Sequence, residues 1–164
     1  MISGSEAIFP NNVTIALAAE FAKIDSAVPV FKRPIRVGDP VQAWAIVPAT
    51  WEPDNDSWEF RGDQNLSSPS LYRYVIAIQC FNQDMDGERG LAVATQMAGI
   101  ARNILSRSVD VRVALSLLSH SEHGFTERFK KGYVLGQRFL SNEIDGHFLH
   151  LSTLEFLIET EVLK

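Results

Sequence analysis

The sequence predicts a two-layer α+β domain in which a mostly antiparallel sheet packs against one long helix and one or two shorter helices. Three observations predict this class. Helix-like and strand-like patterns alternate along the chain, an apolar stripe of helical period spans 86–107, and Asp145-Gly146 separates two strand-like runs near the C-terminal end. Asp-Gly in that position indicates an antiparallel hairpin, because both residues tolerate a positive φ.

The composition is that of one ordinary globular domain. Of 164 residues, 46% are hydrophobic and 21% are charged, so we expect a single domain over 1–164. The lone cysteine, Cys80, excludes a disulfide scaffold. No apolar run approaches the roughly 20 residues that span a bilayer, and 1–10 lack the basic residue of a secretory signal. We therefore expect a protein made in the cytoplasm, with no membrane partner.

The first half of the chain predicts a helix followed by a strand. Residues 12–24 have helical spacing on one face, and Asn11 or Asn12 can cap the helix. Residues 28–40 are expected to be an extended connection. Residues 41–47 have the composition of a short strand, which Pro48 is expected to end because proline cannot donate to a sheet ladder.

The middle of the chain predicts a strand and a long helix. Residues 71–81 are aromatic and β-branched, which is typical of a strand. Asp84 or Asp86 can cap the helix that follows, which is expected to end near Arg107. Residues 109–118 fit either a second helix or a strand, and the helix is favoured. Residues 120–124 are expected to form a loop.

The C-terminal hairpin is predicted to pair 133–144 with 148–162. The alternation of the second strand separates two faces. The polar face carries three glutamates, Glu155, Glu159 and Glu161. A catalytic pair of carboxylates is one interpretation, and a solvated or partner-facing side of the sheet is the favoured one.

An acidic stretch at 48–70 carries almost the whole net charge of the chain. It holds five carboxylates against Arg61, a net charge of −4 out of −5, and no helical period, so we expect a long loop or an exposed hairpin. Aromatic residues in such a segment are typical of interface anchors, although they can also fold back onto their own core. The candidate interface residues are Trp51, Glu52, Asp54, Asp56, Trp58 and Phe60.

A basic cluster follows in the second half of the chain. Its centre is Arg128, Lys130 and Lys131, which Arg138, Arg102, Arg107 and Arg112 can extend. Ordinary surface charge is one interpretation. The functional hypothesis is an electrostatic contact in which this cluster of one subunit meets the acidic stretch of the next.

The sequence does not predict an enzyme, a metal site or a cofactor. His120 and His123 fall in an expected loop, and His147 and His150 have the odd spacing that sends strand side chains to opposite faces. There is no Gly-x-Ser-x-Gly motif and no phosphate-binding glycine loop. A small cytosolic enzyme or ligand-binding domain is the rival hypothesis, and it would use His120, His123 or the three glutamates.

Residues 71–162 resemble the tail terminator, or tail completion, proteins of long-tailed bacteriophages. The resemblance rests on a pattern of elements. A strand runs into an Asp-containing turn (LYRYVIAIQCFNQDMDGERG), a small-residue helix follows (LAVATQMAGIARNIL), and a hairpin closes on an alternating acidic strand (ERFKKGYVLGQRFLSNEIDGHFLHLSTLEFLIETEV). The earlier helix and strand also fit the layout of that family, which lacks a catalytic signature.

The resemblance implies a structural virion protein that forms a homohexameric ring. Such a ring caps the tail tube, ends its polymerisation and offers a joining surface to the head. The implied partners are the tail tube protein and a head–tail connector or neck protein, with the tape measure protein as a further candidate. DNA would pass through the lumen without sequence-specific binding. A negative lumen would repel phosphate, so Glu155, Glu159 and Glu161 are the candidate lumen residues. The alternative within this class is another connector, neck or minor tail protein.

Overall fold

The computed structural model describes residues 9–36, 38–53, 70–122 and 125–163. Within these residues the chain forms three helices and six strands. They follow in the order α1 (Phe9–Phe21), β1 (Val30–Phe31), β2 (Gln42–Pro53), β3 (Ser70–Asp84), α3 (Gly87–Arg107), α4 (Val109–Ser116), β4 (Ser119–Glu122), β5 (Phe125–Ile144) and β6 (His147–Leu163). The α+β class predicted from the sequence is confirmed.

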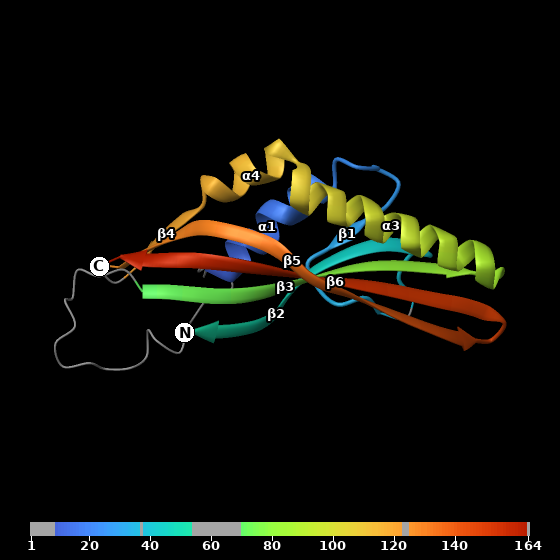
Figure 1. Ribbon diagram of the computed structural model, residues 1–164. Helices are drawn as coiled ribbons and strands as arrows, with labels where there is room; N and C mark the ends of the chain where they lie inside the picture. Colours follow the sequence, from blue (N-terminus) through green and yellow to red (C-terminus); the bar gives the residue numbers. More distant parts are fainter. Residues whose placement is uncertain (1–8, 37, 54–69, 123–124, 164) are drawn as a thin grey trace.

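The six strands form one sheet in the order β1-β2-β3-β6-β5-β4. Only the short β1–β2 contact is parallel, and every other pair is antiparallel. The long strands β3, β5 and β6 cross the whole molecule and twist strongly along their length (Figure 1). This is the mostly antiparallel sheet that the sequence predicts.

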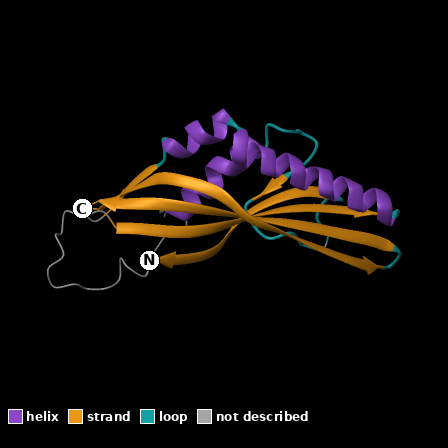
Figure 2. Cartoon of the chain, in the orientation of Figure 1, coloured by secondary structure: helices purple, strands orange, loops and turns teal. Residues whose placement is uncertain are grey.

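All three helices lie on the same side of the sheet (Figure 2). The core is therefore a single layer between the helices and the even-numbered residues of β2, β3 and β6. At its centre the ring of Phe21 meets that of Trp44 edge to face, with 5.3 Å between centroids. The largest fully buried side chains of this layer are Phe21, Phe156, Leu17, Ile46, Ile76, Ile78, Leu115, Leu154, Ile158, Val13 and Val111.

The opposite face of the sheet is partly covered by the chain between β1 and β2. The backbone N–H of Ile35 donates to the side chain of Gln79 on β3. The guanidinium of Arg33 donates to both carboxylate oxygens of Asp39, at 2.7 and 2.8 Å, and lies over the ring of Phe31. This local bridge holds the connection against the β2–β3 side and leaves the β6–β5 side of that face open.

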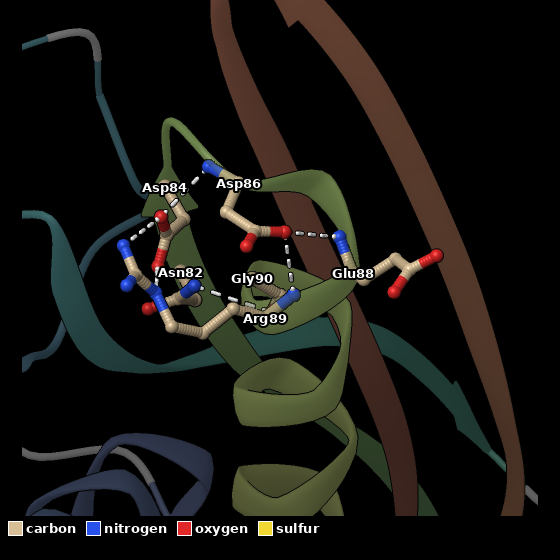
Figure 3. A network of polar contacts seen from close by, with 6 residues as sticks. All are labelled: Asn82, Asp84, Asp86, Glu88, Arg89 and Gly90. Atoms are coloured by element: carbon tan, nitrogen blue, oxygen red, sulfur yellow. Dashed lines mark hydrogen bonds and ion pairs between the residues drawn. The ribbon is translucent and has the colours of Figure 1, made fainter.

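A polar network fixes the turn from β3 into α3 (Figure 3). Asp86 is the N-cap, and its carboxylate accepts from the backbone N–H groups of Glu88 and Arg89 at 3.0 and 3.1 Å. Asp84 accepts two hydrogen bonds from the side chain of Arg89, at 2.6 and 2.8 Å. The two bonds to Asp86 satisfy backbone N–H groups of the helix that would otherwise lack partners. The sequence predicts either Asp84 or Asp86 as the N-cap, and in the structure the N-cap is Asp86.

Several sequence predictions are confirmed at residue level. The segment 109–118 is helical over Val109–Ser116, with Ser108 as its N-cap. Asp145 and Gly146 form a two-residue turn with φ of 51° and 76°, and Ile144 pairs directly with His147. The hairpin is longer than predicted, because β5 begins eight residues before 133.

Two of the predicted element boundaries in the first half of the chain are wrong. The first helix begins at Phe9 and ends at Phe21, earlier than predicted. Strand β2 does not end at Pro48 but continues to Pro53, with a register shift between Pro48 and Thr50. Strand β1 pairs with β2 only at Trp44 and Ala45. Beyond these residues β2 is an edge of the sheet, where the N–H that Pro48 lacks breaks no hydrogen bond of the ladder.

The predicted loop at 120–124 is also partly wrong. Residues Ser119–Glu122 form β4, which pairs with the first residues of β5. A hydrogen bond joins the hydroxyls of Ser121 and Thr126 across this pair. The segment is polar and short, so its pairing depends on β5 rather than on its own strand propensity.

Two glycines of α3 are expected to respond in opposite ways to substitution by alanine. A Cβ at Gly90 would lie 2.9 Å from both Asp84 Cβ and His150 Cδ2, whereas Gly99 has nothing within 4 Å. We expect Gly90→Ala to lower the free energy of unfolding by about 1–3 kcal/mol through overpacking. We expect Gly99→Ala to raise it by about 0.5–1 kcal/mol through helix propensity. Urea denaturation of both variants checks this, and equal effects would contradict the close approach of α3.

The stability of the protein is expected to fall as the pH drops from about 4 to about 2. The Arg89 guanidinium beside Asp84 lowers the pKa of that carboxyl to about 2, and the Arg33 guanidinium does the same for Asp39. Each carboxyl titrates near 3.9 when unfolded, so the stabilisation is present above that pH and is lost on descending through the folded pKa. In thermal melts, Asp39→Asn/Asp84→Asn should show a flatter pH dependence over this window. If the melting temperature of the variant changed with pH as steeply as that of the wild type, the assignment of this pH dependence to Asp39 and Asp84 would be contradicted.

Candidate assembly surfaces

The outer edge of β5 is the most exposed element of the sheet. Strand β4 pairs only with residues 125–128 of β5, so from Phe129 to Ile144 no described strand lies on its outer side. Phe139, Leu140 and Ile144 are 54%, 65% and 47% exposed, and Tyr133 and Leu135 are also exposed. A long strand edge with exposed apolar side chains is a template for another chain.

Two bulges divide β5 into a proximal and a distal part. The pairing with β6 skips one residue between Phe129 and Lys131 and another between Val134 and Gly136. Bulges and lysines are features that protect an edge from pairing, and they are confined to the proximal part. The distal part, 136–144, has neither a bulge nor a proline. It is therefore the part of the edge best suited to accept a partner.

The predicted basic residues lie on the proximal part of β5. Arg128 and Lys130 are exposed there. Lys131 stands opposite Glu159 of β6, with 3.6 Å between the ammonium and the carboxylate. The structure thus brings the basic cluster and the three glutamates together on neighbouring strands, a proximity that the sequence analysis does not predict.

Glu155, Glu159 and Glu161 share the sheet face turned away from the helices, as the alternation predicts. Glu159 is only 5% exposed and lies between two cations, Arg73 at 3.5 Å and Lys131 at 3.6 Å. Glu155 forms an ion pair with Arg138, and Glu161 stands opposite Arg128 in the strand register. The charge of this face is therefore largely balanced.

A groove of about 790 Å³ lies on the other side of β5, between the end of α3, α4 and the strand. The described residues of its lining are apolar, small polar or basic, and none of them is a carboxylate. The lining residues are Arg102, Leu105, Ser106, Val111, Arg112, Leu115, Ser116, Phe129, Lys131, Gly132, Tyr133, Val134 and Phe156.

Two arginines give this groove its charge on the helix side. The guanidinium of Arg112 donates to the backbone carbonyl of Ser106 at 2.7 Å, which holds it at the junction of α3 and α4. Arg102 lies one turn earlier on α3 and is exposed. Lys131 contributes to the wall, but its ammonium is engaged by Glu159 on the opposite face.

The acidic stretch falls largely outside the described residues. Asp54, Asp56, Trp58 and Phe60 lie outside them, so their predicted roles stay predictions. Trp51 and Glu52 belong to β2, where they pair with Tyr74 and Arg73 of β3. The stretch therefore begins as an ordered strand, and not as a loop from residue 48 onward.

The described residues contain no group of three or more His, Cys, Asp or Glu side chains that could hold a metal ion. His150 is buried and hydrogen-bonded to Ser141, whereas His147 lies at the hairpin turn. Cys80 is buried, and desolvation raises the pKa of its thiol. Among the same residues, no helix combines the length and apolar character needed to cross a membrane.

No family model and no curated protein matches the sequence. The fold is similar to that of a chain in the "Virion of native gene transfer agent (GTA) particle", with a TM-score of 0.52 and 13% sequence identity. The match covers 97% of this chain and 99% of that one. The similarity thus concerns the fold, over nearly the full length of both chains.

Sequence reasoning missed the apolar residues of the β5 edge. Phe139 and Leu140 are neighbours, so one of them must face away from any core, yet both are exposed. The sequence signal for this exposure was the presence of apolar residues at both odd-numbered and even-numbered positions of the predicted strand. The sequence alone does not reveal that this strand lies near the edge of the sheet.

The buried carboxylate of Glu159 gives a prediction about the open sheet face. We expect Arg73→Met/Lys131→Met to lower the free energy of unfolding by about 3 kcal/mol, because it leaves a buried charge without a partner. The matched control is Arg138→Met, which breaks the more exposed pair with Glu155 and should cost less than about 1 kcal/mol. Denaturant titration measures both, and similar losses would contradict a special position for Glu159.

Proposed function

We propose that the protein is a structural component of a phage-like particle and acts by assembly rather than by catalysis. In this proposal six copies form a ring on the finished tail tube. The ring ends tube polymerisation, because its outer face does not reproduce the growing end, and it offers a joining surface to the head. Its partners are further copies of itself, the tail tube protein, and a head–tail connector or neck protein, with the tape measure protein as a further candidate.

The observation that carries this proposal is the full-length fold similarity to a virion chain. The match extends over 97% of this chain and 99% of that one. It agrees with the resemblance to tail terminators seen in the order of elements. Fold similarity alone does not determine function, so the surfaces of this chain must supply the rest of the argument.

The edge of β5 is the surface that we assign to contacts between copies. A stable contact buries roughly 800 Å² on each partner. The distal part of β5 has nine residues and is about 30 Å long at roughly 3.3 Å per residue. Covering that edge and its exposed apolar side chains gives a contact of this order. Head-to-tail contacts that close by rotation give rings.

The face carrying Glu155, Glu159 and Glu161 is the candidate lumen wall. Its paired glutamates give a nearly neutral surface instead of the strongly negative one expected from sequence. A neutral wall also suits the passage of DNA, because sequence-independent binding to phosphates requires unpaired cations. In this proposal the ion pairs prevent Arg73, Lys131 and Arg138 from holding DNA in the channel.

Molar mass by light scattering over a concentration series tests the ring. We expect a species of six times the 18.3 kDa chain, and rings with a central opening in negative-stain electron microscopy. A monomer at every concentration would contradict a ring that forms by itself. Immunogold labelling of particles that contain the protein should mark the head-proximal end of the tail, and label along the tube or capsid would contradict the capping role.

The double variant Leu140→Lys/Ile144→Lys tests whether the edge of β5 forms the contact between copies. Both side chains are exposed, so the fold should persist while the charges oppose burial at the contact. We expect association to weaken at least about tenfold. The control is Val109→Lys/Leu117→Lys, which alters two equally exposed apolar residues at α4 and should leave the mass unchanged. Wild-type association of the edge variant would overturn the assignment.

A further inference from the structure

The groove between α3, α4 and β5 has a composition that selects its occupant. Arg102 and Arg112 supply positive charge on the helix side, and no carboxylate is among the described residues that line the groove. The base is formed by aliphatic and aromatic residues, with Phe156 lying so close to Gly132 that a Cβ there would be 2.6 Å from the ring. A small inorganic anion would leave this apolar base in water. An occupant that satisfies both parts must combine carboxylates with apolar groups.

One stretch of this chain has that combination. Beyond the end of β2, residues 54–63 hold four carboxylates, Trp58 and Phe60, with Arg61 as the lone cation. Aromatic anchors flanked by charges are typical of segments that bind in a groove. The volume of about 790 Å³ is within the range that accommodates a ligand of a few large side chains.

We propose that this groove receives the acidic, aromatic stretch of a second copy of the chain. Within one copy, α1 packs against both β2 and α4. A contact between copies leaves the pair with one free stretch and one free groove, so it repeats from copy to copy and can close as a ring. The inference rests on the proposed ring and names one of its contacts.

Two charge-reversal variants test the contact. Arg102→Glu/Arg112→Glu alters the groove, and Asp54→Lys/Asp56→Lys/Glu59→Lys alters the stretch. Each alone should weaken association at least about tenfold, because like charges then face each other. The control is Lys32→Glu/Arg36→Glu, the same change in charge at two exposed residues outside the groove, which should associate like the wild type.

Mixing the two variants distinguishes a contact between copies from one within a copy. The groove variant keeps a wild-type stretch, and the stretch variant keeps a wild-type groove. An equimolar mixture should therefore form a 1:1 pair that neither variant forms alone, detectable by light scattering. A mixture that stays monomeric would overturn the proposal.

The inference and the proposed function can fail separately. A hexamer that persists in the groove variant overturns the groove contact and leaves the ring intact. If the wild type is a monomer, a fluorescent synthetic peptide of residues 54–63 becomes the probe. Binding to the wild type that is lost in the groove variant supports the groove contact although the ring has failed. Absence of binding overturns the groove contact as well.

Discussion

The close packing of α3 against β3 and β6 is the constraint on which the other features depend. The helix meets the sheet through residues with little or no side chain, namely Gly90, Ala94, Ala98 and Ala101. Its first turn is fixed by the Asp86 cap and by a bond from Asn82 to the carbonyl of Gly90. With that end fixed, the far end of α3 and the α4 helix are placed over β5, where the groove forms.

The same packing explains why β5 is exposed. A helix seated over β3 and β6 covers the middle of the sheet and leaves the distal part of β5, where residues 138–144 are exposed, beyond the helical layer. The exposed apolar residues are thus a consequence of where the helix lies, and not of a poorly packed core. Both candidate surfaces, the strand edge and the groove, border this one strand. A single strand can therefore take part in two contacts without any rearrangement of the core.

The sequence predicts most of the fold, because the deciding signals are local. The α3 stripe, the Asp-Gly turn and the alternation of β6 each depend on residues near in the chain. The missed features depend on distant partners. Pro48 is tolerated because β1 is too short to pair beside it, and β4 is a strand because β5 is next to it.

The candidate site was harder to predict for the same reason. The glutamates and the basic cluster are visible in the sequence, but their pairing depends on the register of β3, β6 and β5. That register places Arg73 and Lys131 on either side of Glu159, which converts a predicted acidic surface into a balanced one. The exposed edge of β5 depends on the order of strands in the sheet, which no local pattern reveals.

The two bulges of β5 have a consequence for how its length can vary. Each bulge shifts the alternation of the strand by one residue, so the second returns the distal part to its original phase. Loss of a single residue at 137 or 138, beyond the second bulge, would turn Phe139 away from the helices and Leu140 toward them, exchanging the two faces of the distal edge. Natural variants of this strand should therefore differ by substitution far more readily than by insertion or deletion.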